Sequence, residues 1–175
     1  KAMGCSDADL QQGLEGGGGV TRRCTKTGAG GGVTGSAAYG HHPVEIASVL
    51  SAARQAYDKK VIAVVQPHRY SRLHDLFEEF CTCFNDADTV IVADIYAAGE
   101  APLPGIDKEH FVEALRARGH RHVLALEGPE ALASLITENS QPGDVVVCLG
   151  AGSISAWANA LPEQLENLMG EEKVG

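Results

Sequence analysis

The sequence has little that would place the protein in a membrane, outside the cell or on nucleic acid. No apolar run reaches the roughly 20 residues of a membrane-spanning helix, and no secretory signal pattern is present. The net charge is -9, without a basic stripe to offset it, which argues against a nucleic-acid partner. The five cysteines lack disulfide-framework or zinc-ligand spacing. We therefore expect a cytoplasmic protein with reduced thiols and no metal ligands.

Motifs of several common enzyme classes are also missing. There is no G-x-x-x-x-G-K-[ST], so the chain carries no triphosphate cradle of its own. There is no G-x-S-x-G, and neither Cys nor Ser stands out as a nucleophile. Gly150-Ala151-Gly152 gives only half of the dinucleotide fingerprint, whose third glycine position is Ser155, and this is weak support for NAD binding. Two other interpretations are a tight strand-to-helix turn and a helix start whose amides bind a carboxylate.

What the sequence does contain is an alternation of strand and helix patterns. Apolar strand-type runs occur at 61–65, 89–94, 122–126 and 144–149. Helical patterns occur at 43–57, 71–84, 107–118 and 129–139, and residues 150–154 lead into a last one that runs to about 168. Continuous Val and Ile runs indicate strands buried on both faces. We expect an α/β, Rossmann-like fold with a mostly parallel sheet flanked by helices on both faces.

The two ends of the chain follow a different pattern. Residues 1–13 predict a short helix, with Ser6 as N-cap. Residues 14–38 are rich in glycine and small residues, which predicts a flexible, poorly ordered segment. The polar tail at 170–175 is expected to fray.

Three loops are expected to meet at one edge of the sheet. Right-handed crossovers place the loops after Val65, Asp94 and Leu149 at that edge, with the loop before His41 close by. Ligands bind at the carboxyl ends of strands in open α/β sheets. The common edge is therefore the predicted site.

One of these loops concentrates cationic side chains. His68, Arg69 and Arg72 fall within five residues, just before a helical pattern. Two guanidinium groups beside a helix start suit phosphate or carboxylate oxygens. The alternative is a solvated loop whose arginines pair with Asp75 or Glu78.

A histidine pair, His41 and His42, precedes the first of the predicted helices after the glycine-rich segment. A neutral imidazole there could exchange a hydrogen bond with a ligand. An adjacent pair of this kind is more often structural or solvent-facing. Spacing alone leaves both interpretations open.

Four motifs, taken together, resemble one family. They are YGHHP at 39–43, QPHRYSR at 66–72, DIYAAGE at 94–100 and GAGSI at 150–154. Their order and spacing resemble the C-terminal domain of the Mur ligases of peptidoglycan synthesis, over about residues 20–165. The resemblance implies that 1–19 end a preceding central domain or linker and that 20–175 form the C-terminal domain.

The resemblance extends to an activity. Within the family the chain is most similar to the bacterial cytoplasmic enzyme that joins L-alanine to UDP-N-acetylmuramate through an acyl phosphate, with ATP and Mg²⁺. Both of these would be held mainly by the central domain, so this chain alone is expected to be inactive. A related ligase that recycles a tripeptide, and a non-catalytic anion-binding module, remain alternatives. No nucleic-acid or membrane partner is expected.

The resemblance also assigns residues. It implies ATP contacts for Arg23 and Tyr39, a place at the reaction centre for His41, and no metal ligand. It implies substrate contacts for His68, Arg69, Arg72, Gly150, Ala151, Gly152 and Ser153.

Departures from the family pattern cluster in 14–38. Ala37 and Ala38 stand where the family has two acidic residues, and Cys24 stands where an aromatic is usual. Glycine runs at 16–19 and 30–32 replace bulky residues. Because the departures cluster in one segment, we favour the interpretation that these glycines and alanines replace larger residues of which only the stub is recorded. An altered nucleotide contact at Ala38 is the other interpretation.

Overall fold

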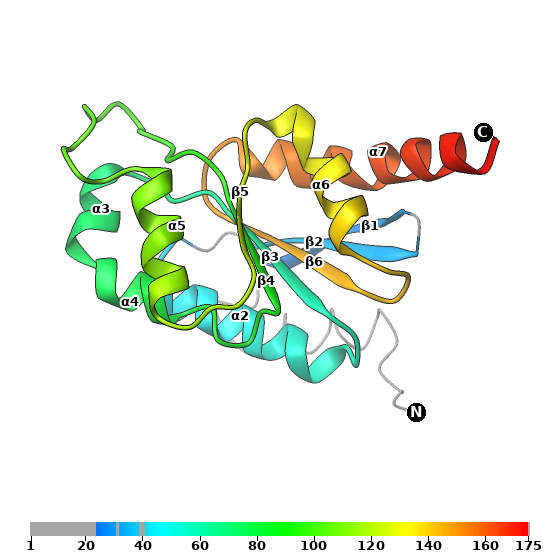
Figure 1. Ribbon diagram of the computed structural model, residues 1–175, viewed down its shortest axis with the longest axis horizontal. Coiled ribbons are helices and arrows are strands. Elements are labelled where there is room, and N and C mark those ends of the chain that lie inside the picture. The colour runs from blue at the N-terminus through cyan, green and yellow to red at the C-terminus, as the bar shows by residue number, and fades with distance from the viewer. Residues whose placement is uncertain (1–23, 31, 39–40, 175) are drawn as a thin grey trace.

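A six-stranded sheet forms the centre of the molecule (Figure 1). The computed structural model describes residues 24–30, 32–38 and 41–174. The strands are β1 Cys24–Gly30, β2 Val33–Ala38, β3 Val61–Val65, β4 Thr89–Val92, β5 Val123–Ala125 and β6 Val145–Leu149, in the order β1-β2-β6-β3-β4-β5. Only the β1–β2 pair in this sheet is antiparallel, which confirms the mostly parallel sheet.

The helices cover both faces of the sheet, as expected. They are α2 Pro43–Ala56, α3 Tyr70–Asp75, α4 Phe77–Thr82, α5 Lys108–Ala117, α6 Leu132–Asn139 and α7 Ile154–Val174, with a 3₁₀ turn at Pro129–Ala131. On β3, Val61, Ala63 and Val65 belong to the core under α2, α4 and α5. Ile62 and Val64 belong to the core under α6 and α7. Two-sided burial explains the uninterrupted apolar run.

The prediction that 14–38 is flexible is wrong for the part that the structure describes. β1 and β2 occupy most of that part, and Thr34–Ala38 of β2 pair in parallel with Val145–Leu149 of β6. Small residues have low strand propensity, but pairing with a buried strand satisfies their backbone groups. Tertiary pairing therefore overrides the local preference. The helix expected at 1–13 lies outside the described residues.

Two helix boundaries also differ from the sequence prediction. The helix expected at 71–84 is divided at Leu76, whose φ of -115° and ψ of 26° are not helical. The tail expected to fray continues α7 to Val174, because Glu and Lys are good helix formers that extend an existing helix at little cost. Over its described length, no helix of the chain is long and apolar enough to cross a membrane.

Candidate active-site edge

The loops after β3, β4 and β6 meet at one edge of the sheet, which confirms the predicted placement. Gln66 N donates to Leu149 O at 2.9 Å, and Ala93 N donates to Val65 O at 2.9 Å. Beyond the strands, His68 and Tyr96 form an isolated parallel bridge. Backbone hydrogen bonds thus join the loops as well as the strands that precede them.

His68 lies at the centre of this edge. Its ring stacks on Tyr96, with centroids 5.4 Å apart and planes at 12°. The centroid of His41 lies 5.8 Å away, so the loop before α2 is close by, as predicted. Tyr39 and Arg23, the two predicted ATP contacts, lie outside the described residues.

Arg72 fixes the protonation pattern of His68. Its Nη1 lies 3.1 Å from His68 Nδ1 and donates to His68 O at 3.3 Å. A guanidinium only donates, so Nδ1 accepts and the neutral ring carries its proton on Nε2. Burial lowers the pKa of His68, the charges of Arg72 and then Arg69 lower it further, and Glu100 opposes them. His68 is therefore a neutral imidazole beside two cations at pH 7.

Arg69 is held in an unusual backbone conformation. Its φ is 76°, a region that a non-glycine residue rarely adopts. Its amide donates to Tyr96 O at 2.7 Å, and Tyr96 N donates to Pro67 O at 2.8 Å. The neighbouring loop thus imposes the conformation, and strain of this kind concentrates at functional sites. The side chain is exposed at the edge.

The alternative pairing of these arginines with nearby carboxylates is wrong. Asp75 pairs with His74, and Glu78 pairs with Arg118 of the α5 C-cap. Arg72 instead contacts His68, and the side chain of Arg69 is exposed.

Glu100 is a site residue that the sequence reasoning missed. Its carboxylate accepts from Ser71 N at 3.0 Å and from Ser71 Oγ, and these hydrogen bonds lower its pKa. Glu100 thereby ties the loop after β4 to the first turn of α3. The sequence signal that could have identified it is an acidic residue in the loop after β4, because the topology places that loop beside the loop that carries Arg69 and Arg72.

The turn between β6 and α7 is compact. Gln66 Nε2 donates to Ser153 Oγ at 2.9 Å, and Gln66 Oε1 accepts from Ile154 N at 3.1 Å. A Cβ at Gly150 would lie 2.7 Å from Ile154 Cγ2, and one at Gly152 would lie 2.6 Å from Tyr96 Cγ. This geometry fits the tight-turn interpretation. Gln66 bonds to this turn, and the sequence reasoning did not single it out. The signal that could have identified it is an amide side chain directly after a buried strand.

His42 has a structural role. Its Nδ1 accepts from Val44 N at 3.2 Å, and its own amide donates to Glu45 Oε1 at 3.3 Å. These contacts form a capping box at the start of α2. Of the histidine pair, only His41 faces the candidate site through the ring of His68.

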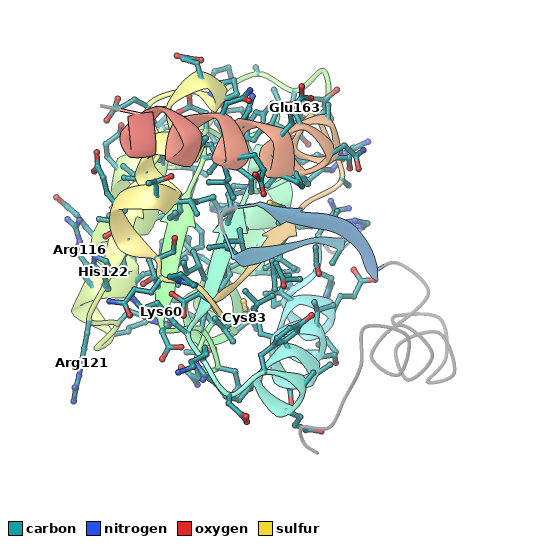
Figure 2. All side chains as sticks on the ribbon, turned by 90° about the vertical axis from the view of Figure 1, so that its right-hand side faces the viewer. Lys60, Cys83, Arg116, Arg121, His122 and Glu163 are labelled. Atoms are coloured by element: carbon teal, nitrogen blue, oxygen red, sulfur yellow. The ribbon has the colours of Figure 1, made fainter. Side chains whose placement is uncertain are left out.

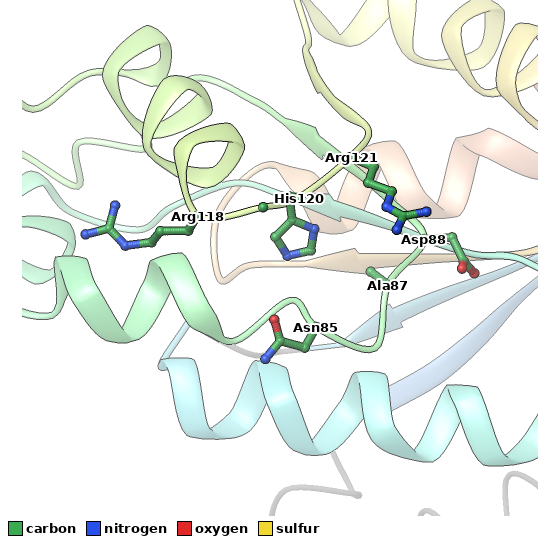
Figure 3. A pocket seen from close by; sticks show the side chains of 7 residues that line it. Asn85, Ala87, Asp88, Arg118, His120 and Arg121 are labelled. Carbon is green, nitrogen blue, oxygen red and sulfur yellow. The ribbon is translucent and has the colours of Figure 1, made fainter.

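One hollow of the described structure lies away from this edge. A cavity of about 250 Å³ opens at the amino ends of β4 and β5, among Asp88, Arg118, His120 and Arg121 (Figure 3). Figure 2 faces this opposite edge, where Arg121 extends away from the body. A second cavity of about 200 Å³ adjoins the candidate site at Gln66, Asp94, Tyr96 and Trp157. We place the site at the carboxyl edge because of its chemistry and position.

The described residues contain no cluster of metal-ligating side chains. Within 24–174, leaving aside 31, 39 and 40, there is no group of three or more His, Cys, Asp or Glu side chains that could hold one. A Mg²⁺ ion prefers carboxylate oxygens and phosphate.

Comparison with known proteins connects this geometry to a family. The family described as Mur ligase, glutamate ligase domain, matches residues 22–152. The UDP-N-acetylmuramate–L-alanine ligase of Parvibaculum lavamentivorans is 61% identical over 171 residues, which are 98% of this chain and 35% of that protein. The ligase of the same name from Gluconacetobacter diazotrophicus is 63% identical over 166 residues, 95% of this chain and 35% of that protein. The chain thus spans about a third of the length of these relatives.

Solved structures agree on the fold. The UDP-N-acetylmuramate-alanine ligase MurC of Thermotoga maritima matches with a TM-score of 0.60 at 22% identity, covering 78% of this chain and 27% of that one. A domain from a putative UDP-N-acetylmuramate:L-alanyl-gamma-D-glutamyl-medo-diaminopimelate ligase of Haemophilus ducreyi matches with a TM-score of 0.58 at 21% identity, covering 79% and 95%. At these identities the similarity supports the fold alone. Together with the family match, it confirms the resemblance read from the four motifs, and the chain belongs to the family described as Mur ligase, glutamate ligase domain.

Proposed function

We propose that this chain is the C-terminal domain of an ATP-dependent ligase that joins L-alanine to UDP-N-acetylmuramate. In this proposal 20–175 form the domain and 1–19 end the central domain or linker. The observation that carries it is the cationic cluster of Arg69 and Arg72 around neutral His68 at the carboxyl edge of the sheet. The names of the relatives at about 60% identity support the choice of substrates.

The proposed reaction has two steps. The γ-phosphoryl group of ATP passes to the muramate carboxylate, which gives an acyl phosphate and ADP. The amine of L-alanine then attacks the acyl carbon, loses a proton, and inorganic phosphate leaves as the amide forms. The charge in both steps is on phosphate and carboxylate oxygens, which fixed guanidinium groups stabilise.

Each predicted site residue has a place in this proposal. Arg69 and Arg72 bind the amino-acid carboxylate and the anionic substrate, and His68 presents its Nε2–H beside them. His41 lies at the reaction centre, and the turn of Gly150, Ala151, Gly152 and Ser153 borders the amino-acid side. Arg23 and Tyr39 contact ATP, while ATP and Mg²⁺ are held mainly by the rest of the enzyme. The enzyme acts in the bacterial cytoplasm.

The test uses the full-length enzyme that carries this chain. ADP release that needs both UDP-N-acetylmuramate and L-alanine is expected from the wild type. Arg69→Ala should lower kcat/KM at least tenfold, or about 1.4 kcal/mol, because it removes a charge-assisted contact. Arg121→Ala, which removes an exposed guanidinium at the opposite edge, should change kcat/KM less than twofold. Equal kinetics for the two variants would refute the role of Arg69.

The same assay separates the alternatives. A wild type that prefers a preformed tripeptide to L-alanine would be the recycling ligase, which the curated relatives do not favour. A wild type that binds UDP-N-acetylmuramate but releases no ADP would be a non-catalytic binding module.

A further inference from the structure

Gln66 is a buried polar residue for which the proposed reaction assigns no role. It follows β3 directly and is 5% exposed. Burying an amide costs free energy unless both of its ends are hydrogen-bonded. Here both ends are bonded, and both bonds go to the turn between β6 and α7. The side chain therefore links two loops of the site that are more than eighty residues apart in the sequence.

The two hydrogen bonds define where that turn lies. Gln66 Oε1 accepts from Ile154 N, the first amide of α7, so an amide from another loop caps this helix. Gln66 Nε2 donates to Ser153 Oγ, one residue earlier. The main chain adds a third connection, since Gln66 N donates to Leu149 O at the end of β6. The turn is held at its start and at its end by one residue.

The turn also packs directly on the side chain that holds it. A Cβ at Gly152 would lie 2.9 Å from Gln66 Oε1 and 2.7 Å from Tyr96 Cδ2, and a Cβ at Gly150 would lie 3.0 Å from Gln66 O. Contacts this short admit only glycine unless a neighbour moves. Tyr96, which closes the other side of Gly152, stacks on His68. A continuous packed path thus runs from Gln66 through Gly152 and Tyr96 to His68.

We propose that Gln66 is a positioning residue that holds the turn of residues 150–153 against Tyr96 and thereby sets its distance from His68 and Arg72. It acts through the turn and does not contact substrate. This inference rests on the proposed function, because only that function makes the turn and the cationic cluster two walls of one substrate site. In this inference, Gln66 determines where the turn of residues 150–153 lies on the amino-acid side of the site.

The test compares three variants of the full-length enzyme. Gln66→Met keeps the length of the side chain and removes both hydrogen bonds. Gln66→Glu keeps an acceptor for Ile154 N and lets Ser153 Oγ donate instead, so it is the conservative rescue. Gln55→Met makes the same chemical change at an exposed position of α2 and is the matched control.

Two readouts are measured for each variant. We expect Gln66→Met to raise KM for L-alanine at least tenfold, with KM for ATP within twofold, and to speed amide hydrogen exchange in the segment that contains Ile154 about tenfold. Gln66→Glu should stay within threefold of the wild type in both readouts, and Gln55→Met should match the wild type. A purely structural residue would lower stability without this selective change in KM.

Failure of the inference and failure of the proposed function look different. Gln66→Met with an unchanged KM for L-alanine overturns the inference, whether or not the turn exchanges faster. A wild type without alanine-dependent ADP release overturns the proposed function instead. In that case the exchange experiment alone decides whether Gln66 holds the turn, and unchanged exchange in Gln66→Met refutes it.

Discussion

His68 shows how its surroundings set the properties of one residue. Its folded-state pKa lies below the ordinary value of 6.5, because of burial first and then the charges of Arg72 and Arg69. The unfolded chain therefore binds the proton more readily, so stability falls as pH drops through 6.5 toward the lowered pKa. His68→Gln removes this proton uptake. Between about pH 7.5 and about pH 5.5, the free energy of unfolding should fall less in the variant than in the wild type.

Denaturant titrations at the two pH values measure this difference. His120 must stay in place in both proteins, because burial lowers its pKa as well and it contributes a pH dependence of the same sign. Parallel losses of stability in His68→Gln and the wild type would show that the protonation of His68 is not coupled to folding.

At the same scale, the sequence allowed some residues of the site to be predicted and hid others. Arg69 and Arg72 are three apart, a spacing that puts both on one face of a helix that starts near Arg69. The contact that the structure shows is between Arg72 and His68. Gln66 and Glu100 act through partners on other loops. Which distant loop an amide or a carboxylate reaches is set by the fold, so spacing alone could not identify them.

At the scale of an element, the turn from β6 into α7 requires a residue without a side chain at position 152. Gly152→Ala would place a methyl group 2.6 Å from Tyr96 Cγ and 2.9 Å from Gln66 Oε1. Neither neighbour is free to move, since Tyr96 stacks on His68 and Gln66 caps α7. Overpacking of this kind costs about 1–3 kcal/mol. We expect a fall in Tm of several degrees and a rise in KM for L-alanine.

Ser155→Ala is the matched change for Gly152→Ala. Ser155 lies in the first turn of α7 with its side chain exposed, so its loss should leave both Tm and KM close to the wild type. Thermal unfolding and steady-state kinetics on the two variants test the contrast. If Gly152→Ala changed Tm and KM as little as Ser155→Ala, the ring of Tyr96 would be able to move aside at little cost.

The elements that were predicted well differ physically from those that were not. β3 and β6 are continuous apolar runs buried on both faces, a pattern that local sequence records. β1 and β2 consist largely of small residues and exist because β2 pairs with β6. The break at Leu76 lies inside an unbroken helical pattern. Strand pairing and helix breaks of this kind depend on tertiary contacts, which no local pattern contains.

At the scale of the whole molecule, the carboxyl edge carries the exposed apolar residues. Among the residues with a described exposure, the large hydrophobic side chains most open to solvent are Val44 at 66%, Tyr96 at 40% and Leu103 at 37%. Val44 is the second residue of α2, and the other two lie in the loop after β4. Both segments follow the carboxyl ends of strands, and we expect these exposed side chains to belong to a contact surface. In the ligase that we propose, the rest of the enzyme is the partner expected at this edge, since the chain spans about a third of its relatives.

Val44→Ser tests that contact. In this chain alone the substitution should leave stability unchanged, because the side chain is already two-thirds exposed. In the full-length enzyme it should lower kcat/KM about fivefold, the effect of losing roughly 1 kcal/mol of apolar burial when the site closes. Ala117→Ser, at an exposed position at the end of α5, makes a similar polar change away from this edge and should have no effect. If both variants kept wild-type kinetics, the exposed apolar side chain of Val44 would not belong to a surface that the rest of the enzyme covers during catalysis.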